Sequence, residues 1–343
     1  MHLLEVNDPT TWEIFQLRQP WTQFTQSWAW GEFRKHLGYS VRRFALVDEN
    51  DDWLCAMQGE YRRKALGLGF WYAARGPVIS HKVDKDKYRA VISHLVSLMA
   101  EKSKLPRSLF WRIEPPIKVE SQQRHLPPRF LRSLAVSPAS TRLLDLTKTE
   151  DELLRDMHEK TRYNIKVAAR HEVKTRVTAH PADIDHFLQL MTETEKRAGF
   201  VQHSSDYVYK TLQTLAAAKM ARLRVAELNG AMLAANVEIS YGQTVTYLYG
   251  ASSHLMRQAM APYALQWDAI KAAKQEGAKK YDFWGVNPQN VSSVLYKKSW
   301  EGISRFKAGW GGEEVDLIGT WDLPLNMALY NLIFMRRILS GKV

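Results

Sequence analysis

The sequence predicts a mixed α/β protein made of two copies of one domain, and three observations support this fold class. The chain has 343 residues, which exceeds a typical domain of about 150 residues and favours two domains. The same order of predicted elements, namely three strands, a helix and a strand, occurs in both halves. Each half also ends with an aromatic strand reached across a helix, SLFWRIEP and KYDFWGVNP, which is the pattern of a right-handed crossover.

The first half begins with a predicted helix over residues 24–39, which opens near Ser27 and ends at Gly38. Its large aromatic side chains are typical of core positions; they are Trp28, Trp30 and Phe33. Three antiparallel strands are predicted next, followed by a helix and a strand that prolines end. Their ranges are 41–47, 53–63, 67–77, 84–103 and 108–116.

The second half begins with a helix whose start can be read from the sequence. Thr149 is followed three residues later by Glu152, the spacing of a capping box, and we expect the helix to continue to Arg170. Steps of about 100° per residue divide it into two faces. The apolar face has Leu154, Met157, Ile165 and Ala168, and the basic face has Arg155, Arg162, Lys166 and Arg170. The basic face indicates an anionic partner such as a nucleic-acid backbone, or a solvated surface partly neutralised by Glu159 and Glu172.

The rest of the second half repeats the first module. Asn229 and Gly230 are typical of a hairpin turn between two of its strands. The predicted helices are 183–198, 205–219 and 262–277, and the strands are 221–228, 231–240, 243–250 and 279–288. We place the boundary between the modules near residue 143. The last segment, 322–342, is predicted to be an amphipathic helix that docks on the first domain or rests on anionic lipid; its cations are Arg336, Arg337 and Lys342.

The composition limits the class of protein. Hydrophobic residues make up 45% of the chain and aromatic residues 11%, which excludes wholesale disorder. Lys and Arg outnumber Asp and Glu by 48 to 36, a net charge of +12 that favours polyanions or anionic lipid as partners. The single cysteine, Cys55, excludes an internal disulfide and a metal–thiolate cluster. We expect a cytoplasmic protein, with peripheral contact at the inner membrane as an alternative, because neither a signal peptide nor an apolar run of about 20 residues is visible.

Known catalytic motifs do not occur in the sequence. A nucleophile elbow, a Walker loop, an HExxH helix and zinc-ligand spacing are all missing, so we expect no hydrolase, kinase or metal site. KALGLG (64–69) lies between two strands, which favours a hairpin turn over a phosphate loop. Polar and aromatic residues gather at strand ends, in 246–253, 281–288 and 304–315, where ligands bind in α/β folds. Lys307 follows Phe306 and precedes a Gly-rich bend, where a cation either faces a developing negative charge or is simply exposed.

Several of these stretches, in this order, resemble the Fem family (FemABX) of peptidoglycan aminoacyltransferases. They are QSWAWGEFRK, FWYAARGPVI, LDLTKTEDELLRDMHEKTRYNIKVAAR, TEKRAGF, YLYGASS, PYALQWDAI, YDFWGV and RFKAGWGGE. The resemblance covers nearly the whole chain and implies two tandem GNAT-like acyltransferase domains. The first would span 1–143, completed by the tail 310–343, and the second 144–309. A sustained heptad repeat is not visible, which favours the compact form without a coiled-coil arm.

The resemblance also implies a reaction. Family members take the amino acid from aminoacyl-tRNA without a cofactor, and an amine of the stem peptide of a muramyl-peptide precursor attacks the ester to form an amide. The precursor would be UDP-linked or lipid-linked, and we expect the enzyme to act as a monomer. Two alternatives are an acyl-CoA-dependent N-acyltransferase of a small amine or polysaccharide precursor, and a non-catalytic nucleic-acid or membrane-binding protein.

Family roles can be carried over to individual residues. Arg34, or neighbouring Lys35, would hold the phosphates of the precursor, and Tyr72 would contact the substrate. A second phosphate-contacting pair would be His203 and Tyr207, although the family commonly has arginine at the first of these positions. Tyr249, or Tyr247 in its place, would be a further substrate contact, and Phe306 and Lys307 would take part in acyl transfer. The tRNA would bind the basic helix face of Arg155, Arg162, Lys166 and Arg170.

Overall fold

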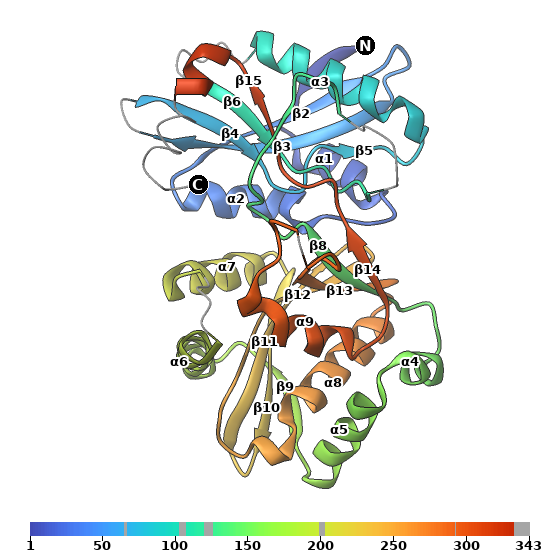
Figure 1. The fold of residues 1–343 in the computed structure, drawn as a ribbon, viewed down its shortest axis with the longest axis vertical. Helices are drawn as coiled ribbons and strands as arrows, with labels where there is room; N and C mark the ends of the chain where they lie inside the picture. Colours follow the sequence, from blue (N-terminus) through green and yellow to red (C-terminus); the bar gives the residue numbers. More distant parts are fainter. Residues whose placement is uncertain (65–66, 103–107, 120–125, 199–202, 292, 333–343) are drawn as a thin grey trace. The chain divides into compact units, whose positions relative to one another are not determined.

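The computed structural model describes residues 1–332 except 65–66, 103–107, 120–125, 199–202 and 292. It divides into two compact units, each with a mixed sheet and helices (Figure 1). Unit 1 contains Met1–Ala139 and the segment from Leu317 onward, and unit 2 contains Ser140–Asp316. The boundary that we placed near residue 143 falls within a strand of unit 2, Ser140–Asp145.

The sheet of unit 1 has the strand order β1-β2-β3-β4-β6-β15-β7, with β5 beside β3. The strands are β1 (His2–Glu5), β2 (Ser40–Val47), β3 (Trp53–Arg63), β4 (Gly69–Ala73), β5 (Val78–Ile79), β6 (Ser108–Ile113), β7 (Leu131–Arg132) and β15 (Trp321–Pro324). The helices are α1 (Pro9–Leu17), α2 (Trp28–His36) and α3 (Tyr88–Lys102). β2, β3 and β4 are antiparallel, and β6 lies parallel to β4 after the α3 crossover, as the sequence predicted.

The sheet of unit 2 has the strand order β14-β8-β13-β12-β11-β10-β9. The strands are β8 (Ser140–Asp145), β9 (Lys174–Thr178), β10 (Ala221–Leu228), β11 (Ala231–Tyr241), β12 (Thr244–Ser252), β13 (Lys280–Val286) and β14 (Glu313–Asp316). The helices are α4 (Glu150–Asp156), α5 (Glu159–Arg170), α6 (Pro181–Ala198), α7 (Ser205–Ala217), α8 (Ala261–Gln275) and α9 (Glu301–Ala308). β10, β11 and β12 are antiparallel, and β13 lies parallel to β12 after α8.

The repeat predicted from the sequence is confirmed. Apart from the two-residue strand β5 between β4 and α3, unit 1 has the order β1-α1-α2-β2-β3-β4-α3-β6, and unit 2 has the order β9-α6-α7-β10-β11-β12-α8-β13. The antiparallel strand that follows β6 in its sheet is β15, from the end of the chain, whereas the strand beside β13 is β8, from before α4. The strand added beside β6 therefore follows the repeated segment of unit 1 in the sequence, whereas the strand added beside β13 precedes the repeated segment of unit 2.

Two predicted helices differ from the observed ones. The capping box of Thr149 and Glu152 is confirmed, but the helix ends at Asp156 and α5 begins at Glu159. Met157 between them is extended and buried in the core, and the His158 side chain caps α5 by accepting from the Lys160 N–H at 3.2 Å. A hydrophobic anchor followed by a new cap therefore interrupts the predicted continuous helix.

The tail also differs from the prediction. Residues 321–324 form β15, paired with β6 and β7, and the chain becomes helical only at 327–332. The predicted cations of the tail helix, Arg336, Arg337 and Lys342, lie outside the described residues. Near the N-terminus, α2 begins one residue after its cap, Ser27, which accepts from the Trp30 N–H at 3.1 Å, and Gly38 follows its end with a φ of 86°.

Candidate functional site

Parallel strands β12 and β13 separate part-way along their length. They are paired from Thr244 and Lys280 to Thr246 and Asp282, although β12 continues to Ser252 and β13 to Val286. In unit 1 the equivalent strands, β4 and β6, stay paired to their last residues. We call the separated segments, 247–252 and 283–286, the strand fork. Its carboxyl-end position in a mixed sheet is where α/β proteins bind ligands.

A bulge in β13 shapes one side of the strand fork. Its register with β8 shifts between Asp282 and Gly285, and Trp284 has a φ of 58°, in the left-handed region. The Asp282 carboxylate is 2% exposed; it accepts from the Trp284 N–H at 2.8 Å and from the hydroxyl of Thr141. These hydrogen bonds hold the bulge in place.

Lys307 extends from α9 to this bulge. Its side chain is 4% exposed, and Nζ donates to the Gly285 carbonyl at 2.7 Å and lies 5.5 Å from the centroid of the Tyr247 ring. Burial lowers the pKa of Lys307 to about 7, against the opposing effect of the Asp282 charge. A lysine that exchanges its proton near neutrality, next to a strand end, is a candidate catalytic group.

Aromatic packing fixes the position of α9. Phe306 makes edge contacts with Tyr263 at 5.5 Å and with Trp310 at 6.0 Å between ring centroids. Trp310 is fully buried in the core of unit 2, and it stacks with Tyr263 at 5.9 Å. The predicted pair therefore consists of two neighbouring residues of α9. Phe306 packs among aromatic rings, and Lys307 lies at the strand fork.

The two candidate tyrosines of β12 belong to different groups. Tyr247 lies under Lys307, and its hydroxyl packs against Gly250, where an added Cβ would lie 1.8 Å away. Burial raises the pKa of Tyr247 to about 12, so its hydroxyl stays neutral. Tyr249 instead makes an edge contact with His203 at 6.4 Å, and His203 stacks on Tyr207 at 4.2 Å. The structure therefore brings Tyr247 to the Lys307 group and Tyr249 to the predicted phosphate pair.

The predicted residues of unit 1 are mostly engaged internally. Arg34 is 6% exposed and forms a two-pronged ion pair with Glu60, with Nη2 and Oε1 2.9 Å apart. Tyr72 is buried, and its hydroxyl donates to Glu114 at 2.6 Å; burial and the Glu114 charge raise the pKa of Tyr72. Lys35 is exposed and lies 2.9 Å from Glu32. Of the two basic candidates, Lys35 is the one that a solvent-borne phosphate can reach.

The predicted basic face contains an exception. Arg155, Lys166 and Arg170 are exposed, but Arg162 is half-buried and donates to the Met157 carbonyl and, at 3.4 Å, to the Leu154 carbonyl. Arg162 therefore caps the end of α4, a role that the continuous-helix prediction concealed.

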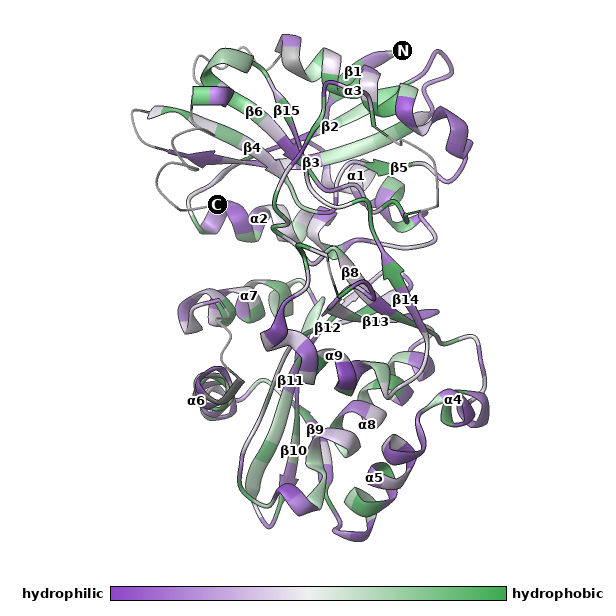
Figure 2. Ribbon diagram, viewed as in Figure 1, coloured by the Kyte–Doolittle hydropathy of each residue, from purple (hydrophilic) through white to green (hydrophobic). Residues whose placement is uncertain are grey.

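An exposed tyrosine accompanies the remaining cations of α5. The Tyr163 side chain is 61% exposed, and the Arg170 guanidinium lies 5.7 Å from its ring centroid. Figure 2 shows α5 as largely hydrophilic. Sequence reasoning about charge alone missed this aromatic group.

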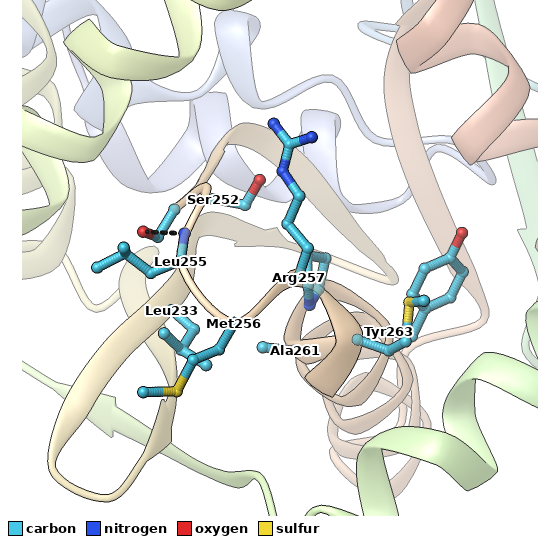
Figure 3. A pocket seen from close by; sticks show the side chains of 10 residues that line it. Leu233, Ser252, Leu255, Met256, Arg257, Ala261 and Tyr263 are labelled. Atoms are coloured by element: carbon cyan, nitrogen blue, oxygen red, sulfur yellow. Dashed lines mark hydrogen bonds between the residues drawn. The ribbon is translucent and has the colours of Figure 1, made fainter.

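A pocket of about 510 Å³ lies between β11, β12 and the start of α8, and sequence reasoning missed it (Figure 3). Its lining includes Leu233, Ser252, Met256, Met260 and Tyr263, and Arg257 extends from the loop before α8. Since Tyr263 also packs on Phe306, the pocket adjoins the Lys307 group. The stretches YLYGASS and PYALQWDAI on its two sides were the available signal.

Within the described ranges, no group of three or more His, Cys, Asp or Glu side chains is placed to hold a metal ion. The helices of the described residues include none with the length and apolar character needed to cross a membrane.

Comparison with known families identifies the chain. The model of the FemAB family matches residues 8–127, 133–232 and 227–336. The chain belongs to the FemAB family. The resemblance inferred from the sequence motifs is confirmed, and with it the expectation of a transferase.

Similar proteins include two named transferases. The UDP-N-acetylmuramoylpentapeptide-lysine N(6)-alanyltransferase of Weissella viridescens is 25% identical over an alignment of 313 residues, which covers 86% of this chain and 90% of that protein. The lipid II:glycine glycyltransferase of Staphylococcus epidermidis (strain ATCC 35984 / DSM 28319 / BCRC 17069 / CCUG 31568 / BM 3577 / RP62A) is 23% identical over 381 residues, covering 89% of this chain and 88% of that protein.

Solved structures share the fold. The crystal structure of FemX aligns over 97% of this chain and 100% of its own, with a TM-score of 0.81 and 20% identity. The C-terminal domain of a putative lysylphosphatidylglycerol synthetase from Agrobacterium fabrum covers 98% of each chain with a TM-score of 0.55 and 14% identity. The predicted mixed α/β fold class is confirmed by the two mixed sheets and by the likeness to FemX.

Proposed function

We propose that this chain transfers an amino acid from aminoacyl-tRNA to an amine on the stem peptide of a peptidoglycan precursor. The relatives named as alanyl- and glycyltransferases of muramoylpentapeptide and lipid II support the acceptor class. The observation that carries the proposal is the buried Lys307 in the strand fork. Its ammonium group donates a hydrogen bond to the Gly285 carbonyl, and burial lowers its pKa to about 7.

The reaction needs little acid–base chemistry, because the ester of aminoacyl-tRNA is already activated. The neutral acceptor amine attacks the ester carbonyl, a C–N bond forms, and the carbonyl oxygen becomes an oxyanion. The C–O bond to the ribose then breaks, the ribose oxygen takes up a proton, and the nitrogen loses one. Catalysis consists chiefly of positioning the two substrates and stabilising the oxyanion.

Lys307 has the donors for this role. An ammonium group has three N–H donors, and one is given to Gly285. Within the described part of the chain the other two have no hydrogen-bond partner. In this proposal they face the oxyanion, in a buried setting where such donors act strongly; removal of one comparable donor costs about 10²- to 10³-fold in rate.

The RNA would bind the exposed side of α5. Lys166 and Arg170 supply charges for phosphates, and Tyr163 offers a ring on which an unpaired base can stack. Arg155 adds a third exposed cation, although Glu152 lies 4.0 Å away. We do not assign Arg162 to RNA binding, because its guanidinium caps α4.

Two exposed groups are candidates for the phosphates of the precursor, namely Lys35 in unit 1 and the group of His203, Tyr207 and Tyr249 in unit 2. Lys35 offers an exposed charge, and His203 an exposed ring stacked on Tyr207. Both suit phosphates joined to a carrier, which a UDP-linked and a lipid-linked precursor share. For the lipid-linked form, the enzyme would work in the cytoplasm at the inner face of the membrane.

The test is direct transfer. Purified protein is incubated with a mixture of charged tRNAs and one precursor, and the UDP-linked and lipid-linked precursors are tested in separate reactions. The mass of the precursor is then measured by mass spectrometry. We expect a gain of one amino-acid residue. Lys307→Met should abolish the gain, while Lys298→Met, the same change at an exposed lysine just before α9, should not. A gain from acyl-CoA in place of charged tRNA would overturn the proposed donor.

A further inference from the structure

The β13 bulge depends on one buried carboxylate. Asp282 stands between Tyr281 and Phe283, which are both fully buried in the core of unit 2. Its Oδ1 accepts from the Trp284 N–H at 2.8 Å, within its own strand, and from the Thr141 hydroxyl of neighbouring β8. One oxygen atom therefore joins the two strands where their register shifts.

The bulge determines which backbone carbonyl accepts the hydrogen bond from Lys307. Pairing with β8 resumes at Gly285, opposite Thr141, and the Gly285 carbonyl accepts the hydrogen bond from Lys307 Nζ at 2.7 Å. A regular strand would alternate its side chains and peptide groups without the extra residue, so Gly285 would be shifted along the ladder. The carbonyl is thus available to Lys307 only while the bulge is in place.

We propose that Asp282 is a positioning residue for Lys307, which holds the β13 bulge closed so that the Gly285 carbonyl meets the ammonium group. The proposal rests on the proposed function only in making Lys307 the catalytic group. Asp282 itself is buried behind the bulge and acts through Gly285 and through its charge.

The charge of Asp282 provides a readout that packing alone does not affect. Burial favours the neutral amine of Lys307, and among the described residues the Asp282 carboxylate is the charge that opposes it. β12 contributes Tyr247, whose hydroxyl stays neutral, and α9 contributes Phe306, which has no charge. Removing the carboxylate charge should therefore lower the pKa of Lys307 further.

Three variants separate the hydrogen bonds from the charge. Asp282→Asn keeps an acceptor oxygen for Trp284 and Thr141 but removes the charge. Thr141→Val removes one hydrogen bond and keeps the charge. Asp282→Ala removes both, and it should lose transfer activity at least about tenfold, as expected when a catalytic group is displaced by about 1 Å.

The experiment is a pH titration of the lysine side-chain ¹³C and ¹⁵N signals in the full chain, with the Lys307 signal assigned from its loss in Lys307→Met. In the parent protein the midpoint should lie near pH 7. Asp282→Asn should lower the midpoint by about one pH unit, the effect of losing a nearby opposite charge. Thr141→Val should leave the midpoint in place.

The proposal is overturned if Asp282→Asn leaves the midpoint unchanged and Asp282→Ala, shown to be folded by its circular dichroism, transfers at the parent rate. The titration requires no substrate, so it tests the role of Asp282 independently of the proposed aminoacyl transfer. A shifted midpoint in a protein that never transfers an amino acid would sustain the effect of the Asp282 charge on Lys307 and overturn the proposed reaction instead.

Discussion

Transfer by this chain should show a break in its pH dependence near pH 7. An acceptor amine has a pKa of about 10, so its neutral form rises about tenfold for each pH unit below that value. Lys307 has its pKa lowered to about 7 by burial, so its ammonium form is lost above pH 7. If the ammonium is the active form, the two effects cancel. The rate constant should rise about tenfold per unit from pH 5 to 7 and then stay level to pH 9.

The assay is kcat/KM for amide formation, measured with labelled aminoacyl-tRNA over this pH range. A matched variant moves the break. Lys307→Cys alkylated with 2-bromoethylamine restores an amine of nearly the same length, in which sulfur lowers the pKa. Position 307 is nearly as buried as Cys55, so Cys55 is first replaced by alanine and the variant is alkylated in urea and then refolded.

The alkylated variant should regain activity and show its break at a lower pH than the parent. Two results would refute the reasoning. One is a parent rate that continues to rise tenfold per unit up to pH 9. The other is a break at the same pH in Lys307→Met, which would assign the titration to another group.

The packing of Tyr247, Arg34 and Arg162 can in each case be tested by a single substitution. Gly250→Ala should lower transfer activity, measured by steady-state kinetics, at least about tenfold, because its Cβ would displace the Tyr247 side chain, whose ring centroid lies 5.5 Å from Lys307 Nζ. Arg34→Met should lower the free energy of unfolding by about 1.5–3 kcal/mol, measured in urea, because the buried Glu60 carboxylate then keeps only Arg62 as its ionic partner; a loss below 1 kcal/mol would contradict the buried ion pair. Arg162→Ala should lower the free energy of unfolding by about 1 kcal/mol through loss of the α4 cap. Lys166→Ala should instead weaken RNA binding and reduce its salt dependence, which RNA titrations at two salt concentrations would show.

The elements could be predicted because their signals are local. The capping box of Thr149 and Glu152, the Asn229-Gly230 turn and the end of α2 near Gly38 each depend on neighbouring residues, and each lies where the sequence predicted it. The repeat followed from the order of such elements. The α4–α5 break was missed because it depends on Met157 entering a core made by distant segments.

The site was less accessible to sequence reasoning. Lys307 was singled out by its place before a Gly-rich bend and then chosen through the resemblance, but its burial depends on α9 packing against Tyr263 and β13. The partner of Asp282 is Thr141, which is 141 residues away in the sequence, and no periodicity points to such a pair. The ion pair between Arg34 and Glu60 likewise could not be predicted from the sequence. Residue type and motif order can name candidates, whereas their charge state depends on long-range contacts.

In the reaction that we propose, Lys307 in the strand fork stabilises the transition state of aminoacyl transfer. The most direct measurement compares single-turnover transfer and RNA affinity for the parent protein and Lys307→Met. We predict a fall of about 10²- to 10³-fold in the transfer rate with unchanged RNA affinity. An unchanged rate, or a loss of transfer fully explained by weaker RNA binding, would contradict the claim.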